Sequence, residues 1–242
     1  FGVTHFTGLL ISFTLIFALL ADLLLLPRTV LEKHGWWRID AVLLDLGVSS
    51  RQLDAPERGF RFSEETADVT PLDMRMDQRL PATAADLLSS ASASEIERWL
   101  REYGELPGAH RLALAIDETR RSAPLRTVRD LLRLVERARV GGGRRHHPAT
   151  LVFQALRIAV NDELGALADA IDASIESLAP GGRLAVLSYH SLEDRLVKQR
   201  LRAEARGCVC PPRQPVCTCG RKPRVRIVTP RAVRAGAEEL RE

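Results

Sequence analysis

Apolar residues occur in two different patterns along the chain, and these predict a membrane-type helix followed by an α/β protein. From Leu9 to Leu26 the residues are apolar except for one aspartate and two hydroxyl residues, and a run of this length can cross a bilayer as a helix. The segment Ile39–Leu46 is a shorter apolar run, typical of a strand buried on both faces. We therefore expect a separate segment at 1–27 and an α/β fold after residue 35.

A series of helices without intervening strands is predicted in the middle of the chain. The expected helices are Thr83–Ser89, Ser94–Tyr103 with Ser94 and Glu97 as a capping box, Arg111–Arg121, and Thr127–Arg139 with Thr127 as the N-cap. Because no strand alternates with these helices, they indicate an all-helical domain, residues 79–147, inserted into the α/β fold.

The second part of the α/β fold is predicted after this insertion. A helical region from Pro148 to Leu178 ends at a Pro-Gly-Gly turn, a second buried strand is expected at Arg183–Tyr189, and a basic helix at Leu192–Arg206. This order is typical of a doubly wound sheet. The core segments are then 28–78 and 148–206, and residues 207–242 form a basic tail rich in cysteine.

Polar residues follow both predicted strands. The stretch from Asp45 to Gln52 comes after the first strand, and the stretch from His190 to Asp194 comes after the second. Ligands of open α/β sheets bind at the carboxyl ends of the strands. We therefore expect functional residues in these two stretches.

The charge of the chain is weakly basic, with a formal net charge of +4 and an isoelectric point near 9.2. This balance is compatible with a polyanionic partner but does not require one. Cations are concentrated in two loops, at Arg144 and Arg145 and at Arg221, Lys222 and Arg224. Contacts to nucleic-acid phosphates and ordinary solvated surface charge explain these clusters equally well.

All four cysteines lie close together, as Cys208, Cys210, Cys217 and Cys219. Short-spaced thiolates with a rigid proline-rich turn between them suit a tetrahedral soft metal such as zinc. Reduced structural thiols are an equal alternative. Two disulfides are less favoured, because nothing else in the sequence indicates an oxidising compartment.

Six ordered motifs closely resemble the bacterial ribosomal RNA small-subunit methyltransferase H family, also called MraW. They are LLDLGVSS at 43–50, ERGF at 57–60, PLDMRMD at 71–77, HPAT at 147–150, FQALRI at 153–158 and SYHSLEDR at 188–195. The resemblance implies an S-adenosylmethionine-dependent enzyme that methylates the exocyclic N4 of a decoding-centre cytidine in 16S ribosomal RNA of the small subunit. It also implies a cytoplasmic protein with a Rossmann-like methyltransferase domain, an inserted helical domain and no membrane.

The resemblance also assigns cofactor contacts to Asp45 and Gln52, whose side chains can hydrogen bond to S-adenosylmethionine. A hydrogen-bond acceptor near the cytosine amine would assist methyl transfer, and the candidates are Asp73, Asp77, His190 and Asp194. Structural roles are as plausible, with Asp73 paired to Arg75 and Asp194 capping the following helix. Side chains that could flank the target base are Phe60, Phe62, Met74 and Tyr189.

Two features of the N-terminal part depart from the family pattern. The family's glycine-rich cofactor loop is not found before Gly141, and Phe17–Pro27 resembles the last membrane helix of resistance-nodulation-division exporters. We therefore expect an N-terminally truncated methyltransferase with a partial sheet, joined to a foreign membrane helix. A catalytically inactive RNA-binding fragment and a membrane-tethered protein are the alternatives.

Overall fold

The computed structural model describes residues 33, 38–48, 55–62, 65–141, 147–211 and 214–234. Three predicted site residues, Gln52, Arg144 and Arg145, lie outside these ranges, as does the apolar segment 1–27. Within the ranges, no helix is both long enough and apolar enough to span a membrane.

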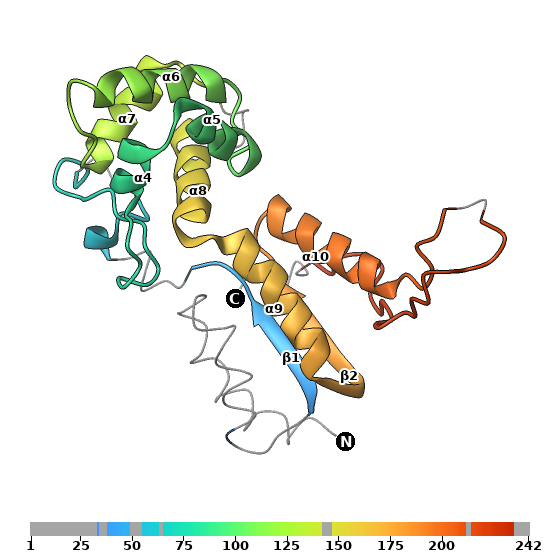
Figure 1. Cartoon of the computed structure of the whole chain (residues 1–242). Coiled ribbons are helices and arrows are strands. Elements are labelled where there is room, and N and C mark those ends of the chain that lie inside the picture. The colour runs from blue at the N-terminus through green and yellow to red at the C-terminus, as the bar shows by residue number, and fades with distance from the viewer. Residues whose placement is uncertain are drawn as a thin grey trace.

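The described elements are seven α-helices, one 3-10 helix and two strands (Figure 1). Their order is β1 (Ile39–Asp45), η1 (Pro56–Arg58), α4 (Ala84–Ser90), α5 (Ala93–Glu102), α6 (Ala109–Arg120), α7 (Val128–Arg137), α8 (Pro148–Asn161), α9 (Glu163–Ser177), β2 (Leu178–Leu187) and α10 (Ser191–Ala205). The α/β class is therefore confirmed, with a small parallel sheet.

The strands β1 and β2 pair in parallel, so their carboxyl ends lie at the same edge. Regular pairing begins at Ala41 with Arg183 and continues to Asp45 with Leu187. The Pro-Gly-Gly sequence, predicted as a turn, is instead part of β2 and coincides with a shift in register, with Gly181 at φ +86°.

The prediction that the first strand is buried on both faces is wrong for the part of the sheet that the structure describes. In β1, Leu44 and Val42 pack toward α9 and α10, but Leu43 is 38% exposed. In β2, which was also predicted to be buried, Leu187 is 48% exposed. Leucine-rich sequence does not distinguish a one-sided strand from a two-sided one when the alternate positions are also apolar.

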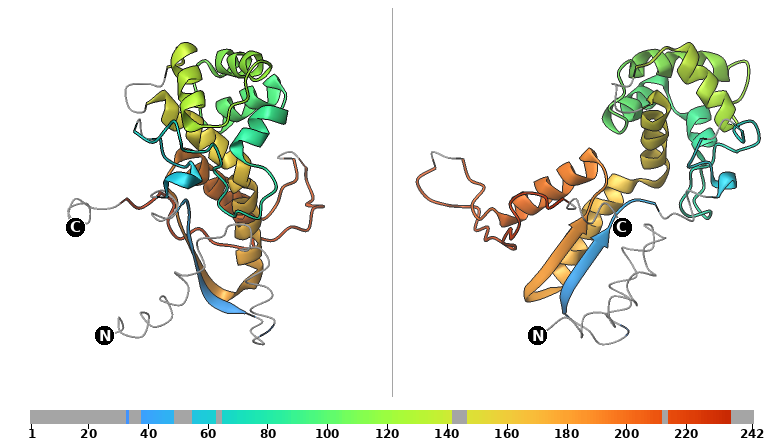
Figure 2. Two further views of the ribbon diagram at one scale, coloured as in Figure 1. Left: turned by 90° about the vertical axis from the view of Figure 1, so that its left-hand side faces the viewer. Right: turned by 180° about the vertical axis from the view of Figure 1, so that it is seen from behind.

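Buried apolar side chains form two separate clusters. The first extends from Phe60 to Leu156 and is made by the 60–76 segment and helices α4 to α8. The second lies between the two strands and helices α9 and α10, around Leu44, Leu167 and Ile171. Figures 1 and 2 show these two bodies at opposite ends of the α8–α9 junction.

That junction divides the helical region predicted from Pro148 to Leu178. Asp162 adopts a left-handed conformation, with φ at 47°, which ends α8 and begins α9. A single change of backbone direction here moves the chain from the first cluster to the second. Periodicity alone did not reveal it, because both helices are apolar on their inner faces.

Capping boxes begin three helices of the first cluster, α4, α5 and α7. Thr127 is confirmed as the N-cap of α7, where Asp130 completes the box. The box predicted at Ser94 and Glu97 is wrong, because Ser92 and Glu95 cap α5 instead. Both serines precede a glutamate at the required spacing, and the short turn after α4 places the helix start at the earlier serine.

Candidate active site

The carboxyl edge of the two strands brings Asp45 and Tyr189 together. The Tyr189 hydroxyl donates a hydrogen bond of 2.7 Å to Asp45 Oδ1, across 144 residues of chain. This hydrogen bond is the main cause that raises the pKa of Tyr189. The Tyr189 ring is 70% exposed, so the pair forms an accessible polar edge with an aromatic face.

Gly47 follows β1 directly beside this pair. Its φ is +98°, a conformation that favours glycine. A side chain added at Gly47 would place its Cβ 3.5 Å from the Tyr189 ring. This is an ordinary van der Waals distance, so the positive φ, and not a lack of space, is what favours glycine at this position.

His190 and Glu193 form the start of α10 behind Tyr189. Glu193 Oε2 accepts hydrogen bonds from the backbone N–H of Tyr189 at 2.8 Å and of His190 at 3.3 Å, and His190 Nδ1 accepts from the Glu193 N–H at 3.5 Å. Burial acts to raise the pKa of Glu193. The contacts of Glu193 with the His190 side chain and the Tyr189 N–H outweigh burial, so the pKa is lowered. His190 is thus the N-cap of α10, and this cap orients Tyr189.

A buried ion pair lies next to this cap. Arg157 of α8 donates two hydrogen bonds to Glu163, at 2.7 and 2.9 Å, and Glu163 is only 5% exposed. Ligand atoms of Glu163, His190 and Glu193 lie within 4.8 Å of one another. Because the two Glu163 oxygens already accept from a bidentate arginine, this group is better suited to positioning than to binding a metal.

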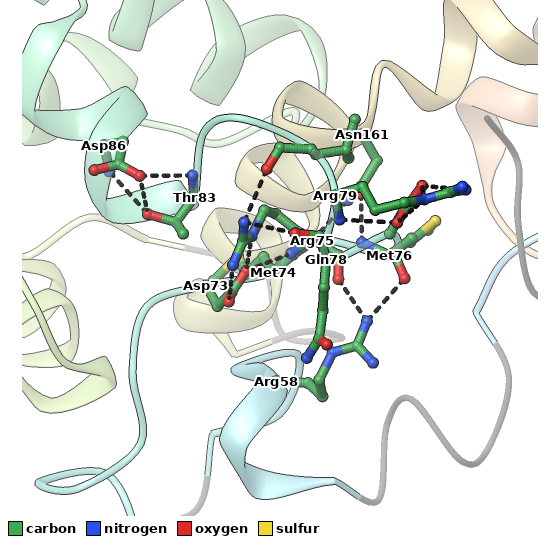
Figure 3. A network of polar contacts seen from close by, with 12 residues as sticks. Arg58, Asp73, Met74, Arg75, Met76, Gln78, Arg79, Thr83, Asp86 and Asn161 are labelled. Atoms are coloured by element: carbon green, nitrogen blue, oxygen red, sulfur yellow. Dashed lines mark hydrogen bonds and ion pairs between the residues drawn. The ribbon is translucent and has the colours of Figure 1, made fainter.

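The segment from Asp73 to Asp77 is held by contacts from both sides (Figure 3). Arg58 donates to the carbonyl oxygens of Arg75 and Met76 at 2.7 and 2.8 Å. Asn161, at the end of α8, accepts from the Met76 N–H at 2.6 Å and donates to Met74 O at 2.8 Å. This segment, predicted as a polar loop, is therefore a fixed part of the structure.

Two of the predicted proton acceptors, Asp73 and Asp77, belong to this segment, and each binds an arginine two residues later. Asp73 binds Arg75 through hydrogen bonds of 2.7 and 2.9 Å. Burial acts to raise the pKa of Asp73, but Arg75 outweighs it and the pKa is lowered. Hydrogen bonds from Arg79 lower the pKa of Asp77. Both side chains are therefore carboxylates at neutral pH.

The other two candidates have structural partners on α10. His190 is the helix cap described above, and Asp194 pairs with Lys198 at 2.6 Å. The expectation that Asp194 caps the helix is wrong, because the cap is formed by His190 and Glu193. The spacing of SYHSLED allows either acidic residue near the helix start, and only Glu193 lies at the third helical position.

Contacts connect the two parts of the candidate site. Asn161 donates to Arg157 O at 2.8 Å, which joins the 73–77 segment to the arginine that binds Glu163. Glu163 lies beside His190 and Glu193, and these position Tyr189 against Asp45. A chain of contacts therefore runs from Asp45 and Tyr189 through Glu193, Glu163 and Arg157 to the backbone of the 73–77 segment. The carboxylates of Asp73 and Asp77 bind Arg75 and Arg79 within that segment. Gln52 is outside the described residues.

Arg157, Asn161 and Glu163 are central to this network, and sequence reasoning did not identify them. Arg157 is part of the FQALRI motif, and the other two are in the Asn-Asp-Glu sequence that follows it. Polar residues at the end of an apolar helical run are a signal that could have found them. Their partners, however, lie up to 87 residues away in the chain.

Of the aromatic and apolar residues predicted to flank a base, only Tyr189 is exposed. Met74 is fully buried and Phe60 is 8% exposed, both in the first cluster. Phe62 is partly buried and stacks near Phe153, with ring centroids 5.1 Å apart. Met74 and Phe60 are therefore core residues and not base contacts.

The basic tail is tied to α10 by ion pairs. Arg221 lies 3.1 Å from Glu204 Oε1, and Arg224 lies 3.3 Å from Glu204 Oε2 and 3.8 Å from Glu176. Lys222 is exposed between them. The four cysteine sulfurs that precede this segment converge, with ligand atoms all within 4.8 Å of one another.

The parallel strands β1 and β2 present the Asp45 carboxylate and the Tyr189 phenol at their carboxyl edge, and helices lie behind them. This arrangement defines an α/β protein of the kind that binds ligands at its strand ends. The chain belongs to the MraW methylase family, whose model matches residues 17–242. Membership in this family implies the fold of an S-adenosylmethionine-dependent methyltransferase.

The chain is similar to ribosomal RNA small subunit methyltransferase H of several bacteria. It is 50% identical over 206 residues to the protein of Heliobacterium modesticaldum, covering 84% of this chain and 64% of the relative. It is 50% identical to those of Trichlorobacter lovleyi and Thermomicrobium roseum, covering 87% and 86% of this chain and 66% and 63% of those relatives. The chain thus spans slightly under two thirds of the length of these relatives.

Proposed function

We propose that this chain belongs to an S-adenosylmethionine-dependent methyltransferase that acts on the exocyclic N4 of a decoding-centre cytidine in 16S ribosomal RNA. The family match over residues 17–242 is the observation that carries the proposal. The names of the relatives support a ribosomal RNA substrate of the small subunit. A cytoplasmic location follows from that substrate.

Asp45 and Gln52 are the proposed cofactor contacts. The carboxylate of Asp45 is at the strand edge and, among the described residues, accepts a hydrogen bond from Tyr189. A carboxylate has about four acceptor positions, so it retains capacity for hydroxyl or amine donors of a cofactor.

S-adenosylmethionine, when bound, would supply a methyl group on a positively charged sulfur. Transfer of this methyl group to cytosine N4 would leave one proton to be removed from the amine. The protein has to align N4 with the methyl group and accept the hydrogen bond of the amine.

We assign the amine acceptor to the Asp73–Asp77 segment and a positioning role to His190. Asp73 and Asp77 are carboxylates at neutral pH and are held by Arg75 and Arg79, so they can accept from a neutral amine without first losing a proton. His190 acts through its cap on α10, which sets the orientation of Tyr189. The exposed Tyr189 ring is a surface on which an extruded base can stack.

The helices α4 to α7 and the basic loops are proposed to bind the RNA. These helices lie between the two strands in the chain and pack into the first cluster, which supports an inserted substrate domain. Arg144, Arg145, Arg221, Lys222 and Arg224 are the proposed phosphate contacts. Because Arg221 and Arg224 are also paired with acidic residues of the protein, Lys222 is the best single test of this role.

Isothermal titration with S-adenosylmethionine tests the cofactor site. We expect the parent chain to bind, and Asp45→Asn to weaken binding about 10- to 100-fold, because a charge-assisted hydrogen bond is worth about 1.5–3 kcal/mol. Asp40→Asn is the matched control, since it makes the same change on an exposed position at the other end of β1. No heat from the parent chain at millimolar cofactor would refute the enzyme proposal for this chain.

If the parent chain does not bind S-adenosylmethionine, the alternative function, an inactive RNA-binding fragment, is favoured. The first cluster and the basic tail, which are proposed to bind RNA, do not depend on the strand edge. Salt-dependent binding to a 16S ribosomal RNA fragment measures the phosphate contacts. We expect Lys222→Ala to weaken binding and to lower the slope of log affinity against log salt by about one. An unchanged slope would remove Lys222 from the interface.

A further inference from the structure

The four cysteines of the chain lie in the loop that follows α10 and projects beyond its end (Figure 1). We propose that Cys208, Cys210, Cys217 and Cys219 form a tetrathiolate zinc site. The proposal does not depend on the proposed methyltransferase activity, since it rests only on the geometry and chemistry of this loop.

The distances between the sulfur atoms match a tetrahedral metal site. Cys217 Sγ lies 3.5 Å from Cys208 Sγ, 3.5 Å from Cys219 Sγ and 4.0 Å from Cys210 Sγ, and Cys219 Sγ lies 3.8 Å from Cys208 Sγ. Four sulfurs bound at about 2.3 Å to one zinc ion lie about 3.8 Å from one another. All four ligand atoms are within 4.8 Å of each other, so one ion can contact every thiolate.

A backbone N–H points at one of the sulfurs. The Cys210 N–H donates to Cys208 Sγ at 3.4 Å. Such donors stabilise negative charge on sulfur and fix the ligand directions.

The exposure of the cysteine side chains argues against a role as reduced thiols that only pack in the interior. Three of the four cysteines are exposed and Cys210 is half-buried, whereas cysteines that serve as packing residues are among the most buried side chains. The sulfurs also form one group of similar separations rather than two close pairs. A disulfide would need a sulfur–sulfur distance of about 2.05 Å, whereas the two separations of 3.5 Å both involve the same Cys217.

A metal at this site would close the loop and orient the basic segment that follows. Arg221 follows Cys219, the last proposed ligand, with only Gly220 between them. The Arg221 guanidinium donates to Ala203 O at 2.9 Å and to Glu204 at 3.1 Å. The Arg224 N–H donates to Glu204 O at 2.9 Å. The zinc site would therefore fix one end of this segment while α10 fixes the other.

The metal content of the 242-residue chain, purified with reductant and without chelator, tests the proposal. We expect one zinc per chain, with X-ray absorption showing four sulfur neighbours at about 2.3 Å. Co²⁺ added to zinc-free protein should give a sulfur-to-cobalt charge-transfer band and the intense d–d bands of tetrahedral cobalt, saturating at one ion per chain. Cobalt binding should release protons from the thiols that were protonated. Zinc added afterwards should replace cobalt and abolish these bands.

Cys217→Ser removes the ligand with the most close sulfur neighbours, and Val209→Ala is the matched control. The Val209 side chain is 53% exposed, and its replacement keeps all four thiols and the Val209 N–H. We expect Cys217→Ser to weaken cobalt binding at least about 100-fold, as loss of a direct ligand exceeds the cost of losing an outer contact. Val209→Ala should bind as the parent does.

Three results would overturn the proposal, and all can be read on the parent chain even if Cys217→Ser does not fold. They are a zinc content near zero together with no charge-transfer band on cobalt addition, cobalt bands of octahedral rather than tetrahedral type, and a mass corresponding to two disulfides in protein isolated without reductant. Equal cobalt affinity of well-folded Cys217→Ser and the parent would also refute it.

Discussion

Asp73 and Asp77 each bind an arginine two residues further along the chain, and this spacing determines what the two carboxylates can do. The bidentate contact of Asp73 with Arg75 keeps its pKa low. A carboxylate of low pKa is a weak base, but it stays ionised at neutral pH and can still accept a hydrogen bond. This chemistry suits a reaction in which the amine gives up its proton only after the methyl group has moved.

Glu193 provides a pH-dependent prediction. Its folded-state pKa is lowered relative to the unfolded value of about 4.3, so its contribution to stability is complete above the unfolded value and is lost as the pH falls through the folded value. We expect Glu193→Gln to lower the free energy of unfolding by about 1–3 kcal/mol at pH 7, because a buried acceptor of two backbone N–H groups loses its charge.

Urea denaturation from pH 7 down to about pH 3 measures this difference, which should shrink below about pH 4 as the parent carboxylate is protonated. Glu102→Gln is the control, since Glu102 is exposed and its contact with Arg101 is long, at 3.8 Å; we expect a change within about 0.5 kcal/mol. A Glu193→Gln difference that stays constant over the whole pH range would contradict the assignment.

Helix α5 shows how a sequence pattern can be right in kind and wrong in position. Ser92 and Ser94 both precede a glutamate by three residues, and the structure uses Ser92. Glu97, the expected partner of Ser94, binds His110 at 2.8 Å and Arg101 at 3.2 Å instead. The start of α5 is therefore set by where α4 ends, which is not a property of the capping sequence itself.

This correction can be tested with two matched substitutions. We expect Ser92→Ala to destabilise the protein by about 1 kcal/mol, since loss of an N-cap hydroxyl costs about 0.5–2 kcal/mol. Ser94→Ala should be neutral within about 0.5 kcal/mol, because it lies inside the helix, where alanine is well tolerated. Thermal and urea unfolding of both variants provide the comparison, and a larger loss for Ser94→Ala would restore the original prediction.

In the whole molecule, the two apolar clusters are connected through the junction of α8 and α9 and through the polar network around Asn161. The clusters share none of their buried apolar residues. Stability can therefore differ between the two bodies, and local opening of one need not open the other.

Amide hydrogen exchange tests this division. Leu131→Ala removes a fully buried side chain of the first cluster and Ile171→Ala does so in the second, each at a cost of about 2–5 kcal/mol. We expect Leu131→Ala to lower protection in α4 to α8 and to leave β1, β2, α9 and α10 nearly unchanged, with the reverse for Ile171→Ala. Equal loss of protection in both bodies would show that the clusters unfold as one unit.

Local sequence was sufficient for several features, because the interactions behind them are short in range. Apolar periodicity and capping residues located β1 and the helices α4 to α7 and α10 to within a few residues, and the motif order identified the methyltransferase family. They did not separate α8 from α9, and β2 begins at Leu178 rather than at the predicted Arg183. Asp45 could be placed at a strand end for the same reason.

The partners of the polar side chains could not be obtained in this way. The Asp45–Tyr189 hydrogen bond spans 144 residues and the Asn161–Met74 contact spans 87, and many other donors and acceptors in the chain have the same chemistry. Three other features also depend on how the elements pack. They are the exposure of Leu43, the choice of Ser92 as the cap of α5, and the burial of Met74 in the core instead of at a base. Side-chain chemistry defines what each residue can bind, but three-dimensional packing selects the partner that lies within reach.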